Sequence, residues 1–275
     1  MDDALTAKQQ HLADLIGSLE SVMVAFSGGV DSSYLLAVCV DRLGPGRVTA
    51  LTVDSPLMPR AELATAREIA TLLGAPLRII PLNELGSDAV AINPADRCYH
   101  CKHLRFEQLL SLVERGELAG TLLHGENADD ALDYRPGARA AAELGVRAPL
   151  AEAGLTKAEI RTLSRLRGLP TWDHPAEACL ATRFPAGTRL TVEGLARVEQ
   201  AEVSLRALLR TGGLRVRDHF PVARIELPAS EIEGAAQEPL RTQIVSAVLA
   251  AGYRHVALDL QGYRMGSMNE QPAQR

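Results

Sequence analysis

The sequence predicts an α/β fold, in which helices cover both faces of a parallel sheet, followed by a smaller α+β domain. Short apolar runs alternate with helical patterns along the first two thirds of the 275 residues. These runs are continuously apolar, which is typical of strands buried on both sides. The order of elements then changes after an irregular segment at 170–187 that is rich in proline and small residues. We therefore expect a first domain at 1–187 and a second, for substrate binding or oligomerisation, at 188–275.

Each element of the first domain has a local signal. An amphipathic helix at 6–19 precedes an apolar strand at 22–26, which ends in Ser-Gly-Gly and leads into a helix beginning at Asp31. Later strands are predicted at 48–53, 77–82 and 121–124, and later helices at 61–73, 102–115 and 156–167. The last helix begins at Thr156 with Glu159 three residues on, the spacing of a capping box.

The second domain has a different pattern. It is predicted to contain a helix at 192–210, strands at 214–217 and 222–227, a helix at 229–249 and a strand at 256–260. We expect the end of the chain, 268–275, to be a frayed tail.

Composition narrows the class of protein. A net charge of −5 gives no global attraction to a polyanion, so nucleic acid is not an expected partner. The N-terminus is acidic and polar, and no apolar run approaches the length of a bilayer span. We therefore expect a soluble, cytoplasmic protein without a membrane partner. With four cysteines in such a chain, a Cys-x-x-Cys pair favours metal or redox chemistry over a structural disulfide.

A glycine turn between the first strand and the next helix predicts a phosphate site. Unpaired backbone N–H groups and the helix dipole attract anions there, and Gly28 and Gly29 allow close approach. Ser27 and Ser32 add hydroxyl donors, while Asp31 is best explained as a Mg²⁺ ligand. The alternative is an ordinary turn capped by Asp31. The complete string SGGVDS favours phosphate binding and resembles the PP-loop of the ATP pyrophosphatases, which cleave ATP between its α- and β-phosphates and transfer AMP to a substrate oxygen.

Two further strand ends belong to the predicted nucleotide site. In the PP-loop superfamily the end of the second strand faces the adenosine, which implies contacts from Thr52, Asp54 and Ser55. Gly125, Asn127 and Asp130 lie in a polar turn after the fourth strand. Because parallel sheets bind ligands at the carboxyl edge of their strands, this turn is expected at the same site. The alternative reading is a solvated Asx turn.

The cysteines leave several chemistries open. Cys98 and Cys101 are spaced to share one metal centre, and Cys179 is able to complete a three-thiolate site that leaves one iron of a 4Fe-4S cluster open. Zinc is the competing reading, and Cys179 as a free nucleophile or sulfur donor, its thiolate favoured by Arg183, is a third. The possible fourth zinc ligands are His100, His103, His124 and His174. Cys39, within an apolar helix, is expected to be a packing residue.

Several segments together identify a resemblance. They are SGGVDSSYLL, NPADRCYHCK, ENADDALDYRPG, LGVRAPL, EAGLTKAEIR, GLPTWDHPAEACLATRFPAG, LRVRDHFPVARIE and LDLQGYRMGSMN. Over residues 24–269 the chain resembles the LarE family of ATP-dependent sulfur transferases. The resemblance implies that ATP adenylylates one carboxylate of pyridinium-3,5-biscarboxylic acid mononucleotide, that pyrophosphate leaves, and that sulfur replaces AMP to give a thiocarboxylate. It also implies Mg²⁺, other proteins of nickel-pincer nucleotide synthesis as partners, and a homo-oligomer.

The LarE resemblance covers two kinds of sulfur chemistry. Some members sacrifice the sulfur of the cysteine that matches Cys179, whereas others hold a 4Fe-4S cluster on three cysteines. Because Cys98, Cys101 and Cys179 all match, the resemblance implies the cluster kind. The chain departs from the family pattern at Glu126, where a threonine is expected, and this argues against a nucleotide contact by that residue.

The resemblance also extends to charged residues near and within the second domain. It implies that Arg183, Arg215, Arg217 and Arg224 serve the substrate or nucleotide and that Glu226 holds a divalent metal. Guanidinium groups suit phosphates and carboxylates, and alternation places Arg215 and Arg217 on one face of a strand. The alternative for each arginine is a solvated surface position.

Three other functions compete with sulfur transfer to the pyridinium nucleotide. A tRNA-thiolating PP-loop enzyme would share the cysteines but is disfavoured by the acidic charge. An ammonia-dependent synthetase would leave the three thiols without a role. A non-catalytic nucleotide or metal carrier would bind ATP without producing AMP.

Overall fold

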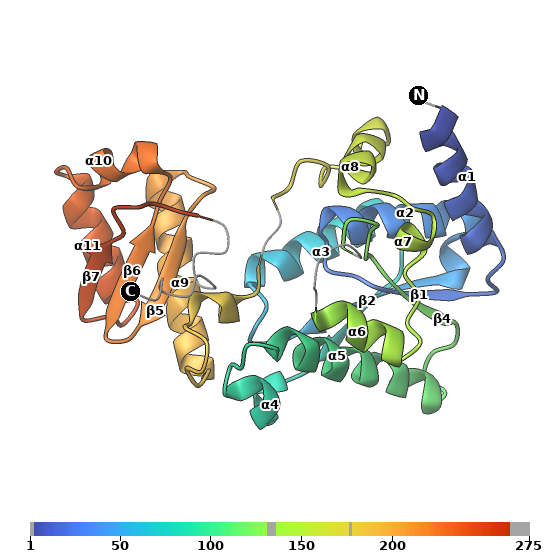
Figure 1. Cartoon of the computed structure of the whole chain (residues 1–275), viewed down its shortest axis with the longest axis horizontal. Coiled ribbons are helices and arrows are strands. Elements are labelled where there is room, and N and C mark those ends of the chain that lie inside the picture. Colours follow the sequence, from blue (N-terminus) through green and yellow to red (C-terminus); the bar gives the residue numbers. More distant parts are fainter. Residues whose placement is uncertain (1–2, 131–135, 176–177, 265–275) are drawn as a thin grey trace, which may run out of the picture. The chain divides into compact units, whose positions relative to one another are not determined.

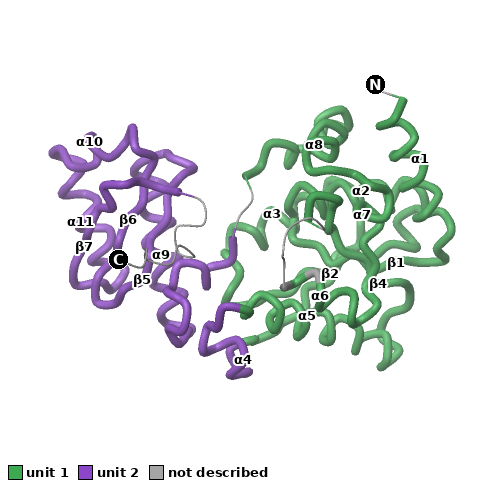
Figure 2. The backbone as a smooth tube through the Cα atoms, viewed as in Figure 1, with its two compact units in different colours: residues 1–84, 96–177 green, residues 85–95, 178–275 purple. Residues whose placement is uncertain are grey.

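The protein forms two compact units, which are coloured separately in Figure 2. The computed structural model describes residues 3–130, 136–175 and 178–264. Unit 1 comprises Met1–Glu84 and Asp96–Glu177, and unit 2 comprises Leu85–Ala95 and Ala178–Arg275. Relative to the predicted division at 187/188, residues 85–95 and 178–187 therefore group with the second unit.

A four-stranded parallel sheet forms the centre of unit 1 (Figure 1). Its strands are β1 (Val22–Ala25), β2 (Val48–Asp54), β3 (Leu77–Pro81) and β4 (Thr121–His124), in the order β3-β2-β1-β4. β1 lies in the middle, with Val24 opposite both Ala50 and Leu123. The carboxyl ends of β1, β2 and β4 consequently meet at one edge, and the α/β fold predicted for this part of the chain is confirmed.

Helices cover both faces of this sheet. They are α1 (Asp3–Gly17), α2 (Val30–Leu43), α3 (Arg60–Leu72), α5 (Arg97–Glu114), α6 (Pro136–Glu143), α7 (Pro149–Glu152) and α8 (Lys157–Leu166). Val22 and Val24 point into a core shared with α1, α2, α3, α7 and α8. Met23 points the other way, into a core shared with α5 and α6. This alternation explains why β1 is apolar on both sides.

Helix α5 begins five residues earlier than the helix predicted at 102–115. Arg97 and Cys101, one turn apart, are both buried, so the inward face of the helix extends to its first turn. The prediction missed this turn because its residues have only moderate helix propensity and no apolar periodicity. As a result, Cys98 and Cys101 lie on a helix rather than in a loop.

Unit 2 has a three-stranded mixed sheet in the order β5-β6-β7. Its strands are β5 (Arg215–His219), β6 (Val222–Glu226) and β7 (His255–Leu258), and its helices are α4 (Asp88–Ala91), α9 (Val192–Leu209), α10 (Ile232–Ala235) and α11 (Leu240–Ala250), with short 3-10 turns at η3 (Leu180–Arg183) and η4 (Ala229–Glu231). Leu205, Val216, Ile225 and Val248 form the centre of its core.

The single helix predicted at 229–249 is wrong, since the segment forms η4, α10 and α11. Pro239 stands at the start of α11, and a proline inside a helix would lack an N–H donor and collide with the preceding turn. The predicted tail at 268–275 lies outside the described residues. Within the described parts of the chain, no helix is both long enough and apolar enough to span a membrane.

Backbone hydrogen bonds attach residues 85–95 to the rest of unit 2. The Leu190 amide donates to the Ala91 carbonyl (2.7 Å), and the Gly187 amide donates to the Asn93 carbonyl (2.8 Å). The Asn93 side-chain amide donates in turn to the Pro185 carbonyl (2.9 Å). These bonds explain why the second unit contains a segment from the middle of the first.

Candidate functional site

The predicted phosphate loop joins β1 to α2. The Ser32 hydroxyl donates to the Gly29 carbonyl (3.2 Å) and lies 3.2 Å from the Ser27 hydroxyl, which also accepts from the Gly29 amide (3.3 Å). The two serines therefore brace the loop from within. The first turn of α2 provides backbone N–H groups without intrahelical partners, and this arrangement suits a phosphate chain.

Two glycines allow this loop to lie close to neighbouring backbone. Gly28 has a φ of +78°, and a Cβ there would lie 3.0 Å from the Ala66 amide nitrogen on α3. Gly125, at the end of β4, would place a Cβ 2.9 Å from the Ser32 amide nitrogen. A side chain at either position would displace the loop or the first turn of α2.

Asp31 lies at the centre of a polar cluster in the first turn of α2. Its Oδ2 accepts from the Lys157 ammonium group (2.6 Å) and from the Asn127 amide (3.4 Å). Burial raises the pKa of Asp31, and the bond from Lys157 opposes that rise. Among the described residues, Oδ1 is buried without a hydrogen-bond partner. A buried carboxylate oxygen left unpaired beside a phosphate loop fits a Mg²⁺ ligand.

The start of α8 brings Lys157 to this cluster, a contribution that the sequence analysis missed. The Lys157 amide donates to Asp129 Oδ2 (2.8 Å), and the Ala128 amide donates to the Leu155 carbonyl (2.8 Å). The turn at 125–130 and the first turn of α8 are thus joined. The capping box predicted at Thr156 and Glu159 is present and marks the helix start, but only the fold shows that Lys157 reaches Asp31.

The turn predicted after β4 lies beside the phosphate loop. Asn127 is buried, and its side-chain oxygen accepts from the amides of Asp129 (3.0 Å) and Asp130 (3.3 Å). Asp130 accepts from the Asn127 amide (3.2 Å) in return. The segment is an Asx turn, and it also presents Asn127 to Asp31. Glu126 instead lies 3.5 Å from the Lys102 ammonium group.

The hydroxyl groups at the end of β2 are engaged within the protein. Thr52 donates to the Phe26 carbonyl (2.7 Å), which fixes the entry to the phosphate loop. Ser55 donates to Glu84 Oε2 (2.5 Å) and accepts from the Leu57 amide (3.0 Å). Both side chains are buried. The contacts predicted between these two residues and an adenosine stay a prediction.

Glu84 is a second residue that the sequence analysis missed. Its carboxylate is fully buried, accepts from Ser55 and from Arg105 Nε (2.7 Å), and lies 3.7 Å from the Cys101 thiol, which donates to it. Glu84 thus connects the end of β2 to the first turns of α5. A glutamate in an irregular segment carries no sequence signal for such a role.

The predicted cysteine ligands differ in their surroundings. Cys98 is exposed and accepts from Arg97 Nη2 (3.3 Å), whereas Cys101 is buried. Cys179 is partly buried and precedes η3 in unit 2. Cys39 is wholly buried in the core, and burial raises its pKa to about 12, as befits an inert packing residue.

The described residues gather no complete metal site. Across 3–130, 136–175 and 178–264, no group of three or more His, Cys, Asp and Glu side chains is placed to hold a metal ion. His124 packs against the Phe106 ring, and burial lowers its pKa to about 3, with Lys102 adding to the effect. Cys98 and Cys101 are one helical turn apart with a guanidinium donor beside Cys98, an arrangement that suits thiolate ligands of one centre.

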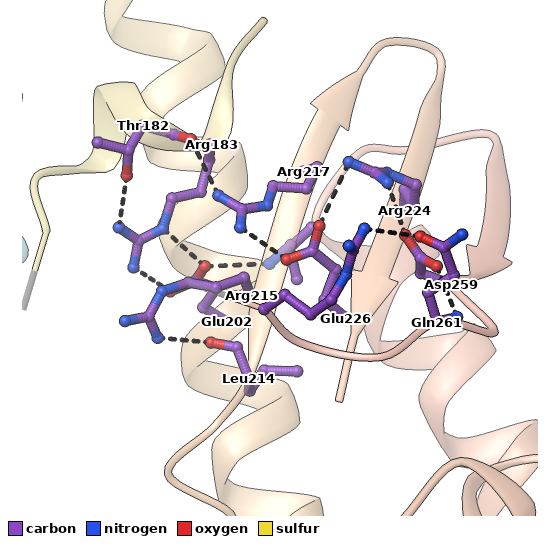
Figure 3. Close-up of polar contacts among 12 residues, drawn as sticks. Thr182, Arg183, Glu202, Leu214, Arg215, Arg217, Arg224, Glu226, Asp259 and Gln261 are labelled. Carbon is purple, nitrogen blue, oxygen red and sulfur yellow. Dashed lines mark hydrogen bonds and ion pairs between the residues drawn. The ribbon is translucent and has the colours of Figure 1, made fainter. Parts of the chain in front are cut away.

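In unit 2, Arg183 is wholly buried, and Figure 3 shows its guanidinium between Thr182 and Glu202. Its Nε and Nη2 donate to the two oxygens of Glu202 (2.9 and 3.0 Å). Its Nη1 donates to the Ala178 carbonyl (2.6 Å) and the Cys179 carbonyl (3.1 Å). The predicted proximity of Arg183 to Cys179 is therefore real, but the guanidinium holds the backbone of the turn rather than projecting toward solvent.

The arginines predicted on β5 and β6 form a linked set (Figure 3). Arg217 donates to Glu226 Oε2 (2.6 Å) and to the Thr182 carbonyl (3.0 Å), and Arg224 donates to Asp259 (2.6 Å) and lies 3.3 Å from Glu226 Oε1. Glu226 is completely buried, so a metal ion there would have to replace one of these guanidiniums. Arg215 lies over the Tyr263 ring, 5.2 Å from its centroid.

Comparison with known proteins agrees with this geometry. The NAD synthase family profile matches residues 9–94, which contain the phosphate loop. The chain is 40% identical to an uncharacterised protein of Synechocystis, covering 96% of this chain and 98% of that protein. It is 36% identical to the pyridinium-3,5-bisthiocarboxylic acid mononucleotide synthase of Lactiplantibacillus plantarum, covering 97% and 95%. An uncharacterised protein of Methanocaldococcus jannaschii is 27% identical over 89% and 91% of the two chains.

The similarity to the synthase spans both units, and the profile match coincides with the strand, glycine turn and helix of the phosphate loop. The chain therefore belongs to the LarE family of PP-loop proteins, the family of the pyridinium-3,5-bisthiocarboxylic acid mononucleotide synthase.

Proposed function

We propose that this protein is an ATP-dependent sulfur transferase acting on pyridinium-3,5-biscarboxylic acid mononucleotide. The observation that carries the proposal is the phosphate loop with its unpaired Asp31 oxygen, in a chain 36% identical to a synthase of the bisthiocarboxylic acid product. The product name fixes the chemical change: a carboxylate oxygen is exchanged for sulfur.

The first step is adenylylation of the substrate. A ring carboxylate oxygen attacks the α-phosphorus of ATP, the bond to the bridging oxygen breaks, and pyrophosphate leaves with the electron pair. Backbone amides around the Gly28–Gly29 turn and in the first turn of α2 stabilise the departing phosphates, since they are fixed before the reaction begins. Lys157 lies beside Asp31 and adds positive charge where negative charge accumulates.

Mg²⁺ fits this step at Asp31, whose Oδ1 is buried and unpaired among the described residues. When bound, Mg²⁺ would neutralise charge on the triphosphate. Asn127 and Lys157 hold the other carboxylate oxygen and so fix the direction of Oδ1. The protein therefore presents one oriented carboxylate oxygen, Asp31 Oδ1, at the first turn of α2.

The second step replaces AMP with sulfur. A sulfur nucleophile attacks the acyl carbon of the adenylate, the bond between that carbon and the AMP oxygen breaks, and AMP leaves with the electron pair. We propose Cys98, Cys101 and Cys179 as ligands of a 4Fe-4S cluster, which would supply a bound sulfide as the nucleophile. The guanidinium beside Cys98 supports thiolate ligation there.

Binding of the substrate is assigned to unit 2. Arg215 and Arg217 on β5 and Arg224 on β6 supply positive charge suited to a phosphate and two carboxylates. Glu226 and Asp259 hold two of these guanidiniums in place. Arg215 is the strongest candidate for direct contact, because its guanidinium lies over the Tyr263 ring and alternation places it on the same strand face as Arg217.

The test is an anaerobic assay of pyrophosphate, AMP and thiocarboxylate with ATP, Mg²⁺ and the pyridinium dicarboxylate. We expect pyrophosphate release only with that substrate, and thiocarboxylate detected by mass spectrometry. Equal stimulation by any small carboxylate would overturn the proposal, as would ATP binding without AMP. The Cys179→Ser variant should release pyrophosphate and form no thiocarboxylate, whereas Cys39→Ser should behave as the unmodified protein.

The sulfur source has its own test. Iron and sulfide analysis of anaerobically purified protein, with its absorption spectrum, should show about four of each per chain if the cluster proposal holds. Colourless, zinc-loaded protein would defeat it. Loss of one H₂S in mass at Cys179 after one turnover would instead support sacrifice of that side chain.

Three broader expectations accompany the proposal. A cytoplasmic location would keep the four free cysteines reduced. A homo-oligomer is supported by apolar side chains exposed on two helices of unit 2, namely Val203 and Leu208 on α9 and Val245 and Leu249 on α11. Other proteins of nickel-pincer nucleotide synthesis are the expected partners, because the product must be passed on for nickel insertion.

A further inference from the structure

The ion pair between Arg183 and Glu202 is unusual because both side chains are almost completely inaccessible to solvent. Arg183 is 0% exposed and Glu202 is 2% exposed. Two parallel hydrogen bonds join them, in the bidentate geometry that fixes a guanidinium plane. Burial of two charges costs much of the free energy gained by pairing them, so stability alone explains such a pair poorly.

The remaining contacts of the pair show what it holds. Glu202 also accepts from the Val216 amide (3.0 Å) on β5 and from Arg206 (3.1 Å), one turn further along α9. Arg183 donates to the carbonyls of Ala178 and Cys179. Through Glu202, Arg183 thus connects the turn that carries Cys179 to helix α9 and to strand β5 of unit 2.

The peptide carbonyl of Cys179 is held by three donors. They are the Thr182 amide (3.1 Å), the Thr182 hydroxyl (2.8 Å) and Arg183 Nη1 (3.1 Å). A carbonyl oxygen has two lone pairs, so three donors saturate it and restrain the peptide from several directions. Once this peptide is fixed, rotation of the Cys179 side chain is the main remaining freedom of its sulfur.

A second guanidinium holds the other end of the turn. Arg217 donates to the Thr182 carbonyl while Glu226 holds the same guanidinium (Figure 3). The turn therefore rests on two carboxylate–guanidinium pairs, one from α9 and one from the sheet. Arg183 and Arg217 both donate to backbone carbonyls of this turn.

We propose that Glu202, acting through Arg183, is a positioning residue that sets the direction of the Cys179 sulfur for the sulfur-transfer step. This rests on the proposed function, in which Cys179 serves that step. Glu202 contacts neither reacting atom. Its effect is to make the Cys179 turn rigid, so that the sulfur is presented in one direction.

The test compares three full-length variants with the unmodified protein. Glu202→Gln keeps the shape of the side chain and removes its charge, and Arg183→Lys keeps the charge and removes the fork. Arg206→Gln is the matched control, because it takes a guanidinium from the same carboxylate and leaves Arg183 in place. Hydrogen exchange of the 178–184 segment is measured together with kcat and KM for thiocarboxylate formation.

For Glu202→Gln and Arg183→Lys we expect the Thr182 amide to exchange about tenfold faster and kcat to fall about tenfold or more, with KM for ATP unchanged. Arg206→Gln should change neither quantity by more than about twofold. Because Glu202→Gln is isosteric, it keeps the test valid if Arg183→Lys does not fold.

Three outcomes would overturn the proposal. They are unchanged exchange at 178–184 in both variants, faster exchange with unchanged kcat, and equal acceleration of amides throughout the unit 2 core. The last would mean a merely structural pair. If the unmodified protein makes no thiocarboxylate, the proposed function fails, whereas the exchange experiment still decides whether the pair holds the turn.

Discussion

The absence of a Cβ atom at two glycines decides the shape of the phosphate loop. Gly28 lies in the left-handed region with no room for a Cβ beside α3, and Gly125 passes just as closely over the first turn of α2. The carboxylate of Asp31, in the first turn of α2, is oriented by hydrogen bonds from Asn127 and Lys157. The loop is therefore set by contacts from three other elements as well as by its own sequence.

Substitution of Gly28 by alanine tests this packing. Gly28→Ala should weaken ATP binding about tenfold or more and lower the free energy of unfolding by about 1–3 kcal/mol, because a Cβ strains the backbone and presses on α3. Gly46→Ala is the matched control, since Gly46 has open space and no positive φ. Calorimetric titration with ATP and denaturant unfolding measure the two effects, and equal ATP affinity in both variants would contradict the prediction.

The buried carboxylate of Glu84 gives a second prediction at this scale. Arg105→Met should destabilise the protein by about 3 kcal/mol, because it leaves a fully buried carboxylate without its guanidinium partner. Adding Glu84→Gln should recover most of that loss, since the amide removes the charge and keeps the shape. Urea unfolding of the single and double variants measures the coupling, and additive losses would show that the two residues act independently.

The site was only partly predictable from residue types. Short strings with a known chemical use, such as SGGVDS and the paired cysteines, could be located at once. Lys157, Glu84 and Glu202 could not, because each acts through a contact with a residue far away in the sequence. Arg183 was correctly placed near Cys179, but no local pattern reveals that Glu202 on α9 pairs with its buried guanidinium.

At the scale of elements, helix α8 places the ammonium group of Lys157 beside Asp31 in the candidate site. Its capping box fixes where the helix begins, and so it fixes where Lys157 meets Asp31. Desolvation raises the pKa of Glu159, but hydrogen bonds from Lys8 and Thr156 outweigh it and hold the pKa below its usual value. The charged form of Glu159 is therefore the one that the fold favours.

This shift predicts a pH-dependent effect. A lowered pKa in the folded state contributes stability above the unfolded pKa, and that contribution is lost as pH falls through the folded value. Glu159→Gln should therefore destabilise the protein by about 1 kcal/mol at pH 7, and the difference should shrink to nothing as the pH falls from the usual glutamate pKa of about 4.3 through the lower pKa of the folded state. Glu193→Gln, an exposed residue in the first turn of α9, is the control. Thermal unfolding measured from pH 7 down to the acid range gives the stability difference between each variant and the unmodified protein. A difference that stays constant for Glu159→Gln would show that the charge of Glu159 is not its cause.

Elements in unit 1 were easier to predict than those in unit 2. The predicted strands at 22–26, 48–53, 77–82 and 121–124 agree with β1 to β4. The signal is clearest for β1, which lies in the middle of the sheet and is apolar on both faces, whereas the edge strand β3 is only partly buried. The start of α5 and the break at Pro239 were missed. The start of α5 depends on tertiary packing, which no local pattern reports. The break at Pro239 was missed because the apolar periodicity continues across this proline, although a proline is not tolerated inside a helix.

At the scale of the whole molecule, each unit has its own core. Val24 and Leu123 belong to the interior of unit 1, and Val216 and Ile225 belong to that of unit 2. The sequence predicted two domains from the change of pattern. The sequence placed residues 85–95 in the first domain, because nothing in these eleven residues indicates that they pair with the segment around Leu190.

Separate cores predict separable effects. Ile225→Ala should lower the stability of unit 2 by about 2–4 kcal/mol, since it opens a cavity in a wholly buried site. ATP binding by unit 1 should keep its affinity within about twofold, because the phosphate loop packs on a different core. Differential scanning calorimetry and calorimetric titration with ATP measure the two quantities. A tenfold loss of ATP affinity would show that the cores are coupled.

The placement of residues 85–95 has a consequence for biosynthesis. Val90 and Ala91 are buried, and the Ala91 carbonyl accepts from the amide of Leu190, which leaves the ribosome roughly 100 residues later. At about 5–20 residues per second, this short apolar stretch waits roughly 5–20 s for its partner. Until then this stretch lacks the backbone partners that hold it in the folded protein, so unit 2 is completed only after the chain has been made beyond Leu190.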